Sequence, residues 1–488
     1  MKVLFAASEA YPLVKTGGLG DVIYSLPHAL QRQGADVGLV LPAYRTVLEK
    51  LKNTRIVGWL DIPGEGRRFS ARIVEGDHDE LGIPLLLVDI ADLFDRPGNP
   101  YQHPDGYDWP DNAERYTVFA RAVTQLAMDR LKLGWKPDVV HCHDWQTGLI
   151  PAMLHMESNA PKSVFTIHNL AYGGLFPHAE YIKLGLPASW WSSDGIEFFG
   201  NMSMLKAGIV FASQVTTVSP TYAREILTPE YGYGYEGVLK SIQYKFRGIL
   251  NGVDPEVWNP RTDEFIPFHY SVQHGYLRGK RQNKKALLGN MGVRAGEKTL
   301  QRPLMGFVGR LVEQKGIDLL LDILPKLIKS SNALFVFLGT GQSWYEARLQ
   351  TLAKKYPSRV LVHLGYSEPL AHLVEAGADL FLMPSRFEPC GLNQLYSLAY
   401  GTLPVVHETG GLADTVVDAT PENVKNKTAT GYVFPDQTPQ SLMGAIDRAL
   451  ADFGHTARWR QLVRTAMRQD FSWDKSAQEY LGLYTGES

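Results

Sequence analysis

Residues 3–21, VLFAASEAYPLVKTGGLGD, place a short apolar run before a glycine-rich turn and the start of a helical pattern. The run Val3–Ala7 predicts a first β-strand, and the residues from about Asp21 to Gln33 predict the helix that follows it. A strand, a glycine-rich loop and a helix in this order are typical of parallel α/β structure. This stretch therefore predicts the first strand–helix unit of a doubly wound sheet.

The same alternation continues along the whole chain in two series. Further strands of the first series are predicted at Val37–Leu41, Leu85–Val88, Val139–Cys142, Val164–Ile167 and Val215–Val218. The second series is predicted at Leu304–Val308, Leu334–Leu338, Val360–Leu364, Leu380–Met383 and Val405–His407, with helices at Ile317–Lys329, Ser343–Lys355, Gly391–Tyr400 and Ser441–Ala451. The stretch Trp59–Val74 is typical of an antiparallel excursion. The predicted fold class is α/β, with two Rossmann-like, doubly wound domains facing across a cleft.

A hinge and an internal repeat both support a division into two halves. The stretch GILNGVDP at residues 248–255 lies between the two series and is interpreted as the hinge. KTGGLGD at residues 15–21 recurs as ETGGLAD at residues 408–414, and each copy follows a predicted strand and opens a helix. Two equivalent halves explain this repeat, although so short a match also arises by chance. We predict an N-terminal domain over residues 1–250 and a C-terminal domain over residues 251–472.

The composition excludes several classes of partner. The chain has 49 Lys and Arg against 51 Asp and Glu, a net charge of −2, so no global field attracts nucleic acid or an anionic membrane. Cys142 and Cys390 are the two cysteines, which suits a reducing compartment. No apolar run approaches the ~18 residues of a membrane helix. These features predict a cytoplasmic protein without membrane or nucleic-acid partners; an organelle lumen reached with a leader is the alternative.

Polar residues follow the predicted strands of both series at their carboxyl ends. They are Lys15 and Asp144 with His168 in the first series, and Arg310 with Glu388 in the second. Ligands of open parallel sheets bind at this edge, because the loops there leave a crevice between the helices. These residues are therefore the candidates for a binding site.

The glycine loop is the first element of that site. Gly17 and Gly18 let a substrate approach backbone N–H groups, and the helix that follows favours an anion at its N-terminus. Lys15 adds a positive charge. The signal is weak alone, and a tight turn with a solvated lysine is the alternative. The chain has no P-loop and no clean Gly-x-Gly-x-x-Gly, which disfavours nucleoside triphosphate hydrolysis and hydride transfer.

Arg310 and Lys315 lie five residues apart on the loop before a predicted helix, so both can address one diphosphate. Glu388 precedes the helix predicted at Gly391–Tyr400, whose N-terminal amides are available to phosphate. A carboxylate repels phosphate, so Glu388 is better suited to accept from two ribose hydroxyls. The structural alternatives are that Arg310 and Lys315 are simply exposed cations, and that Glu388 is a glutamate stabilised by the helix dipole.

The same cations can replace a metal ion. A sugar-nucleotide leaving group departs as a diphosphate that gains negative charge, and Arg310, Lys315 and Lys15 can stabilise it. The only Asp-x-Asp sequence of the kind that metal-dependent transferases use is Asp77-His78-Asp79, which we interpret as a solvated turn. No nucleophile triad or metal-ligand spacing is present. We therefore predict chemistry with no metal and no cofactor.

Several further residues are candidates for sugar contacts, each with a structural alternative. His168 can contact a sugar hydroxyl or be a satisfied core histidine. Asp144 and Asp21 can accept from sugar hydroxyls or cap the helices they precede. Asn251 can touch the sugar or shape the hinge. Tyr101, beside Gly98-Asn99-Pro100 in a long predicted loop, is the aromatic residue best suited to stack on a pyranose ring.

Taken together, the motifs resemble those of bacterial glycogen synthases and plant starch synthases. The resemblance covers essentially the whole chain. It rests on residues 15–22 (KTGGLGDV), 143–146 (HDWQ), 168–172 (HNLAY), 250–254 (LNGVD), 309–311 (GRL) with 315–316 (KG), 385–392 (SRFEPCGL) and 409–412 (TGGL). The order of these strings makes the resemblance specific.

The resemblance implies a role for each matching residue. Arg310 and Lys315 match diphosphate contacts, Glu388 matches an acidic residue of the active site that contacts ribose or donor glucose, and His168 matches a residue at the donor glucose. The further implied substrate-binding residues are Lys15, Gly17, Gly18, Asp21, Tyr101, Asp144, Asn251, Cys390, Gly391, Leu392, Thr409, Gly410 and Gly411.

The family transfers glucose from ADP-glucose to the non-reducing 4-hydroxyl of an α-1,4-glucan with retention, by front-face attack without a covalent intermediate, and releases ADP. The resemblance implies the acceptor side for the N-terminal domain and the nucleotide-sugar side for the C-terminal domain. It also implies that a last helix, at about residues 473–486, crosses back to the N-terminal domain.

Two alternatives to this function remain. A related retaining transferase uses UDP-glucose or a small acceptor, and a donor competition assay separates it from the first hypothesis. A catalytically silent glucan-binding protein belongs to a different class. Such a protein has no need of the diphosphate contacts implied for Arg310 and Lys315, so ADP binding distinguishes it.

Overall fold

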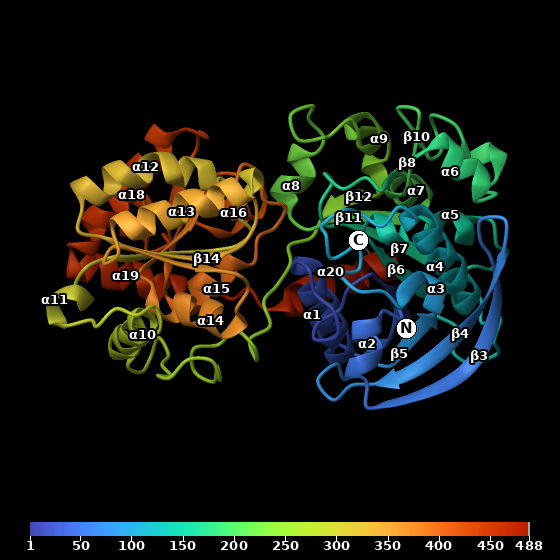
Figure 1. Cartoon of the computed structure of the whole chain (residues 1–488), viewed down its shortest axis with the longest axis horizontal. Coiled ribbons are helices and arrows are strands. Elements are labelled where there is room, and N and C mark those ends of the chain that lie inside the picture. Colours follow the sequence, from blue (N-terminus) through green and yellow to red (C-terminus); the bar gives the residue numbers. More distant parts are fainter. Residues whose placement is uncertain (487–488) are drawn as a thin grey trace. The chain divides into compact units, whose positions relative to one another are not determined.

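The computed structural model describes residues 1–486, which form two compact units (Figure 1). The first unit contains Met1–Asn251 and the chain from Trp473 onward, and the second contains Gly252–Ser472. The sequence places the domain boundary between residues 250 and 251, one residue before the division between the units.

The first unit is built on a nine-stranded sheet of order β12-β11-β7-β6-β1-β2-β5-β4-β3. Its strands are β1 (Lys2–Ala6), β2 (Asp36–Pro42), β3 (Asn53–Pro63), β4 (Arg68–Asp77), β5 (Leu85–Asp89), β6 (Val139–His143), β7 (Lys162–Ile167), β11 (Gln214–Thr217) and β12 (Phe246–Gly248). The strands from β12 to β5 are parallel, whereas β4 is antiparallel to both β5 and β3. The antiparallel excursion expected at Trp59–Val74 is therefore confirmed.

Helices cover this sheet, and the first unit also contains a small, separate sheet. The helices are α1 (Gly18–Arg32), α2 (Arg45–Lys50), α3 (Ala91–Phe94), α4 (Asn112–Ala127), α5 (Leu149–His155), α6 (His178–Lys183), α7 (Met204–Phe211), α8 (Pro220–Glu225), α9 (Glu236–Ser241) and α20 (Trp473–Thr485). The small sheet has the order β8 (Leu175–Pro177), β10 (Asn201–Ser203) and β9 (Glu197–Phe198).

The last helix, α20, belongs to the first unit although it follows the second in sequence. Figure 1 shows it in red beside α1. Trp473, Tyr480 and Tyr484 are buried in the core of the first unit, and the hydroxyl of Ser476 donates to the carbonyl of Leu250 at 2.5 Å. Burial of these three large aromatic rings stabilises the helix against the first unit.

The second unit contains a six-stranded parallel sheet of order β15-β14-β13-β16-β17-β18. Its strands are β13 (Leu304–Val308), β14 (Leu334–Gly339), β15 (Val360–Leu364), β16 (Leu380–Met383), β17 (Leu403–His407) and β18 (Tyr432–Phe434). Its helices are α10 (Tyr276–Asn290), α11 (Glu297–Leu300), α12 (Ile317–Ser330), α13 (Ser343–Lys355), α14 (Glu368–Gly377), α15 (Asn393–Tyr400), α16 (Gly410–Thr415), α17 (Pro421–Asn426), α18 (Pro439–Phe453) and α19 (Thr456–Ala466).

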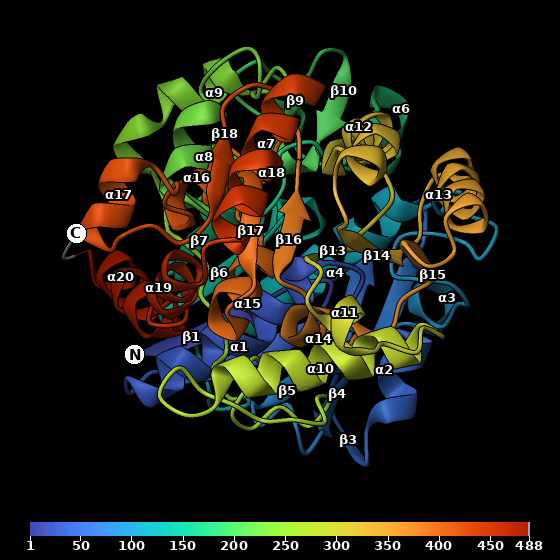
Figure 2. The same ribbon diagram turned by 90° about the vertical axis from the view of Figure 1, so that its left-hand side faces the viewer.

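The central strands of the second unit are apolar because helices cover both faces of the sheet. β16 reads LFLM and all four residues are buried. Figures 1 and 2 show α12 and α18 on one side of the sheet and α10 and α14 on the other. A strand buried on both faces has no polar side and reads as a continuous hydrophobic run. Both units are thus Rossmann-like, and the α/β fold class is confirmed.

Three predicted helix starts differ from the structure, and two of the differences involve glycine. α18 begins at Pro439 rather than at Ser441. α1 begins at Gly18 rather than near Asp21, because Gly17 takes the extended N-cap position. α15 begins at Asn393 rather than at Gly391, whose φ of +71° lies in the left-handed region and cannot continue into a helix.

Candidate active site

In each unit, the candidate residues gather where the strand order changes direction. β1 lies between β2 and β6 in the first unit, and β13 lies between β14 and β16 in the second. From β1 the chain continues to one side of the sheet and from β6 to the other, and the same holds for β13 and β16. The loops at the carboxyl ends of each such pair of strands therefore diverge and leave room for a ligand.

In the first unit, the turn that contains Lys15 is held by a residue that the sequence analysis missed. The carboxylate of Glu9 accepts from both the backbone N–H and the hydroxyl of Thr16 at 2.5 Å, and from the N–H of Gly17 at 3.3 Å. Lys15 Nζ lies 2.8 Å from Asp21 Oδ1. Glu9 follows β1 closely, so the strand-end rule that selected Lys15 also selects Glu9.

Tyr101 reaches the same carboxylate from a distant loop. Its hydroxyl donates to Glu9 and lies 2.9 Å from Ser8 Oγ. Burial, with the neighbouring Glu9 charge, raises the pKa of Tyr101 well above its ordinary value. Tyr101 is therefore a half-buried part of the strand-end cluster, and its ring packs near Trp145, with centroids 6.5 Å apart.

Asp144 fixes the backbone after β7. Its Oδ1 accepts from the N–H of His168 at 2.7 Å, and its own φ is +57°, a left-handed conformation that costs a non-glycine residue energy. The alternative of a helix cap was wrong for Asp144, because its side chain makes no cap hydrogen bond. It was also wrong for Asp21, which lies within the first turn of α1 and pairs with Lys15.

Burial shifts the pKa values of Asp144 and His168 so that the neutral form of each side chain is favoured. It raises the pKa of Asp144 to about 7, against the lowering effect of the backbone N–H groups of His168 and Asn169. It lowers the pKa of His168 to about 3. His168 is thus a neutral imidazole at pH 7, able to donate or accept one hydrogen bond but carrying no charge.

The end of the first unit places Asn251 in a buried position. Its backbone N–H donates to the carbonyl of Val218 at 3.3 Å. Its side-chain oxygen Oδ1 is buried and has no hydrogen-bond partner among the residues that the structure describes. A buried amide oxygen without a partner is costly, and a ligand hydroxyl would satisfy it.

In the second unit, Lys315 and Glu388 form an ion pair that joins the loop after β13 to the loop after β16. Lys315 Nζ lies 2.6 Å from Glu388 Oε2, and the Ser385 hydroxyl donates to the same oxygen at 2.9 Å. The Glu388 side chain is 8% exposed and the Lys315 side chain 22% exposed, so the lysine faces the open side of the pair. Arg310 is exposed on the same loop as Lys315.

The predicted glycine positions of the second unit are sites of close backbone packing. A Cβ on Gly410, at φ +45°, would lie 1.9 Å from the carbonyl oxygen of Glu388, and the N–H of Gly411 donates to that oxygen at 3.1 Å. A Cβ on Gly391 would lie 2.5 Å from Oε1 of Gln394. The turn at residues 409–411 is therefore packed against Glu388 and helps to hold its backbone.

The remaining predicted residues of this unit surround the same loop. Thr409 and Cys390 are buried, and Leu392 is half-buried in a cluster with Val253, Leu395 and Tyr396. These three side chains pack rather than face solvent. The structure thus brings the residues of 388–392 and 409–411 together around Glu388.

Tyr366 is a second residue that the sequence analysis missed. It follows β15, and its side chain is 72% exposed at the carboxyl edge of the sheet that carries Arg310 and Glu388. Its position beside the polar candidate residues of this edge lets the ring stack on a planar ligand. The strand-end rule could have found it, but the sequence analysis applied that rule to polar residues only.

The Asp-x-Asp sequence lies apart from these clusters. Asp77 and Asp79 are exposed at the end of β4, where Asp79 pairs with Lys52. Among residues 1–486, no group of three or more His, Cys, Asp or Glu side chains is arranged to hold a metal ion. No helix in the same range is long and apolar enough to cross a membrane.

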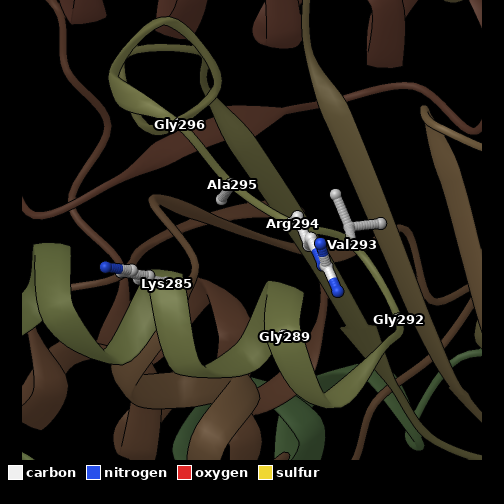
Figure 3. Close-up of a pocket in the computed structure, with 7 residues that line it drawn as sticks. All are labelled: Lys285, Gly289, Gly292, Val293, Arg294, Ala295 and Gly296. Carbon is white, nitrogen blue, oxygen red and sulfur yellow. The ribbon is translucent and has the colours of Figure 1, made fainter.

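A surface pocket of about 540 Å³ lies between the end of α10 and the loop that leads to α11 (Figure 3). Figure 3 shows its two basic side chains, Lys285 and Arg294, pointing in different directions. None of the candidate residues lines it.

Comparison with known proteins agrees with this arrangement. Residues 2–241 match the family model of the starch synthase catalytic domain, and residues 294–465 match that of glycosyl transferases group 1. Two Rossmann-like units with these matches define the chain as a glycosyltransferase. It belongs to the family of bacterial glycogen synthases and plant starch synthases.

The family assignment rests on relatives of full length. Glycogen synthase of Hydrogenovibrio crunogenus is 54% identical over 487 residues, with 99% of each chain covered. Glycogen synthase of Thioalkalivibrio sulfidiphilus is 50% identical, with the same coverage. The catalytic domain of starch synthase IV from Arabidopsis thaliana, solved with ADP and acarbose bound, has a TM-score of 0.88 and 33% identity over 99% of this chain and 98% of that chain.

Proposed function

We propose that this chain transfers glucose from ADP-glucose to the non-reducing 4-hydroxyl of an α-1,4-glucan, with retention of configuration and release of ADP. The names of its relatives support a glucan acceptor, and the ADP bound in the Arabidopsis structure supports an adenine nucleotide donor. In the reaction, the bond from the anomeric carbon to the phosphate oxygen breaks and a bond to the acceptor oxygen forms on the same face. The proton of the acceptor hydroxyl leaves with ADP.

The Lys315–Glu388 pair is the observation that carries this proposal. A lysine ammonium has three N–H donors, and one of them is directed at Glu388 Oε2. The other two remain for the phosphate oxygens of the donor, and the Arg310 guanidinium can bind the same diphosphate in a bidentate manner. Each charge-assisted hydrogen bond contributes about 1.5–3 kcal/mol, which favours the departing ADP as its charge develops.

We propose further roles for the remaining groups of each unit. Glu388 Oε1 accepts from a ribose or glucose hydroxyl, because Oε2 is already bonded to Lys315 and Ser385. Tyr366 stacks on the nucleotide base, since its ring is more exposed (72%) than that of Trp344 (47%), the other exposed ring at this sheet edge. In the first unit, His168 contacts the donor glucose, and Lys15, Asp21, Tyr101, Asp144 and Asn251 bind the sugar or the acceptor.

We propose further that the reaction requires no metal ion and no cofactor. Arg310 and Lys315 supply positive charge at the position where a metal would act. The prediction is that EDTA leaves glucan extension largely unchanged. Loss of activity on chelation, restored by a divalent cation, would contradict it.

A donor competition assay tests the function directly. Purified protein is given radiolabelled ADP-glucose or UDP-glucose with a maltooligosaccharide primer, and label in the extended glucan is counted. Preferential incorporation from ADP-glucose supports the proposal, and preference for UDP-glucose overturns the donor assignment. A chain that binds glucan but incorporates no label from either donor would be a silent binding protein. The cytoplasmic location stays a prediction from the two buried free cysteines.

A further inference from the structure

His143, a buried residue that the proposed function leaves without a role, contacts His168 directly. It is the last residue of β6, is fully buried, and has its Nδ1 2.9 Å from Nε2 of His168. β6 and β7 are neighbouring parallel strands, with His143 opposite Thr166, so the contact is set by the register of the sheet. A buried histidine in this position is not needed for packing alone, since an apolar residue would fill the same space.

The ring of His143 has no freedom to turn away from His168. Its ring stacks on Phe5 of β1, with centroids 5.4 Å apart and planes 17° from parallel, and its centroid lies 4.1 Å from that of His141. His141 is itself fixed by the Tyr484 hydroxyl of α20 at its Nδ1 and by Thr166 Oγ1 at its Nε2, both at 2.7 Å. The contact between His143 and His168 is therefore built on a rigid layer of side chains.

The hydrogen bond between the two rings decides which nitrogen of His168 carries its proton. Burial lowers the pKa of both rings, so at pH 7 each is neutral and has one N–H. One ring must donate and the other must accept. If His168 donated from Nε2, the proton of His143 would sit on its own Nε2, which is buried and has no partner among the described residues. An orphaned buried N–H is rarer than an acceptor without a donor, so donation from His143 is favoured.

We propose that His143 is a positioning residue that donates from Nδ1 to His168 Nε2 and so keeps the proton of His168 on Nδ1. His168 then presents an N–H donor, in a fixed orientation, to an oxygen atom of the donor glucose. Its backbone is held at the same time by Asp144, whose Oδ1 accepts from the His168 N–H at 2.7 Å. This inference rests on the proposed contact between His168 and the donor glucose.

A set of matched variants tests the proposal by activity. His143→Asn places an amide N–H₂ where the imidazole Nδ1 was. His143→Leu has nearly the shape of the asparagine variant but no hydrogen-bond donor. We expect kcat/KM for ADP-glucose to fall about tenfold or more in His143→Leu, which corresponds to about 1.4 kcal/mol. His143→Asn should stay within about threefold of the wild-type value, and KM for the glucan should not change in either variant.

A control and a double-mutant cycle separate positioning from a general loss of stability. Thr124→Val removes a buried hydroxyl of α4 that donates to the carbonyl of Ala120 at 2.8 Å and takes no part in this layer, so its kcat/KM should be unchanged. In a His168→Ala background, His143→Leu should cause no further loss, because the residue through which it acts is gone. An equal loss from His143→Leu in both backgrounds overturns the proposal.

Nitrogen NMR of ¹⁵N-histidine-labelled protein tests the tautomer without any reference to activity. The His168 resonances are assigned from their disappearance in His168→Gln. We expect Nε2 in the range of an unprotonated imidazole nitrogen and Nδ1 in the range of a protonated one. A protonated Nε2 overturns the tautomer. If His168→Ala retains wild-type activity while NMR finds the expected tautomer, the proposed contact with glucose fails and the hydrogen bond itself stands.

Discussion

Replacing Lys315 with alanine removes the cation that the structure places between a buried carboxylate and the open edge of the sheet. The lysine lies 2.6 Å from Glu388 Oε2 and leaves two N–H donors for the substrate phosphates. Losing two charge-assisted hydrogen bonds of about 1.5–3 kcal/mol each raises the barrier by ~3–6 kcal/mol, if both form fully only as ADP departs. That increase lowers kcat by about 10²–10⁴-fold.

The assay is initial-rate incorporation of glucose from ADP-glucose into a maltooligosaccharide, with circular dichroism and a thermal melt to show that the variant is folded. Lys52→Ala is the matched control, because it also breaks a lysine–carboxylate pair. Its pair with Asp79 is 65% and 72% exposed, against 22% and 8% for the pair of Lys315 and Glu388. Exposed pairs contribute little, so Lys52→Ala should be neutral. A folded Lys315→Ala variant with turnover within threefold of wild type would refute the role given to this lysine.

Three further outcomes are expected. Burial raises the pKa of Asp144 to about 7, so the stability of the folded state falls as pH rises from about 4, the ordinary range of a carboxyl group, to about 7. Above that pH the buried side chain is a charged carboxylate. Asp144→Asn should therefore raise the melting temperature by about 2–4 °C at pH 8 and leave it unchanged at pH 4. Tyr366→Ala should raise KM for ADP-glucose by about tenfold through loss of base stacking, whereas Tyr244→Ala, which removes another exposed ring (82%), should leave KM unchanged in the same steady-state assay. Gly410→Ala should lower the melting temperature or prevent folding, because its Cβ would lie 1.9 Å from a carbonyl oxygen at φ +45°, while Gly17→Ala, with no atom within 4 Å of the new Cβ and an extended backbone, should melt like the wild type.

The strand pattern of this chain was predictable because burial on both faces leaves a continuous apolar run. The strand predicted at Leu380–Met383 coincides with β16, and the helix predicted at Ser343–Lys355 coincides with α13. In both cases the decisive information is local. Helix starts at glycine were less predictable, since an extended Gly17 and a left-handed Gly391 act in opposite ways on the helix that follows.

The contacts of the candidate site that escaped the sequence analysis join distant segments. Glu9 is bonded to Tyr101, 92 residues away, and that contact exists only once β1 and the loop before α4 are brought together. His143 and His168 are 25 residues apart and meet because β6 and β7 are neighbours in register. Polar residues at strand ends could be selected from the sequence, but their partners could not, because pairing is set by the order of strands in the sheet.

The repeated Thr-Gly-Gly turn shows the limit of a local pattern most directly. Both copies follow a strand and open a helix, α1 after Gly17 and α16 after Thr409. The first is held by the Glu9 carboxylate, which accepts from the Gly17 N–H, and no atom lies within 4 Å of a Cβ placed on Gly17. The second is packed against the carbonyl of Glu388, so its glycines position a neighbouring loop. The same three residue types therefore predict a strand-to-helix turn in both halves, but whether the glycines of the turn are open or closely packed is decided by the loop beside it.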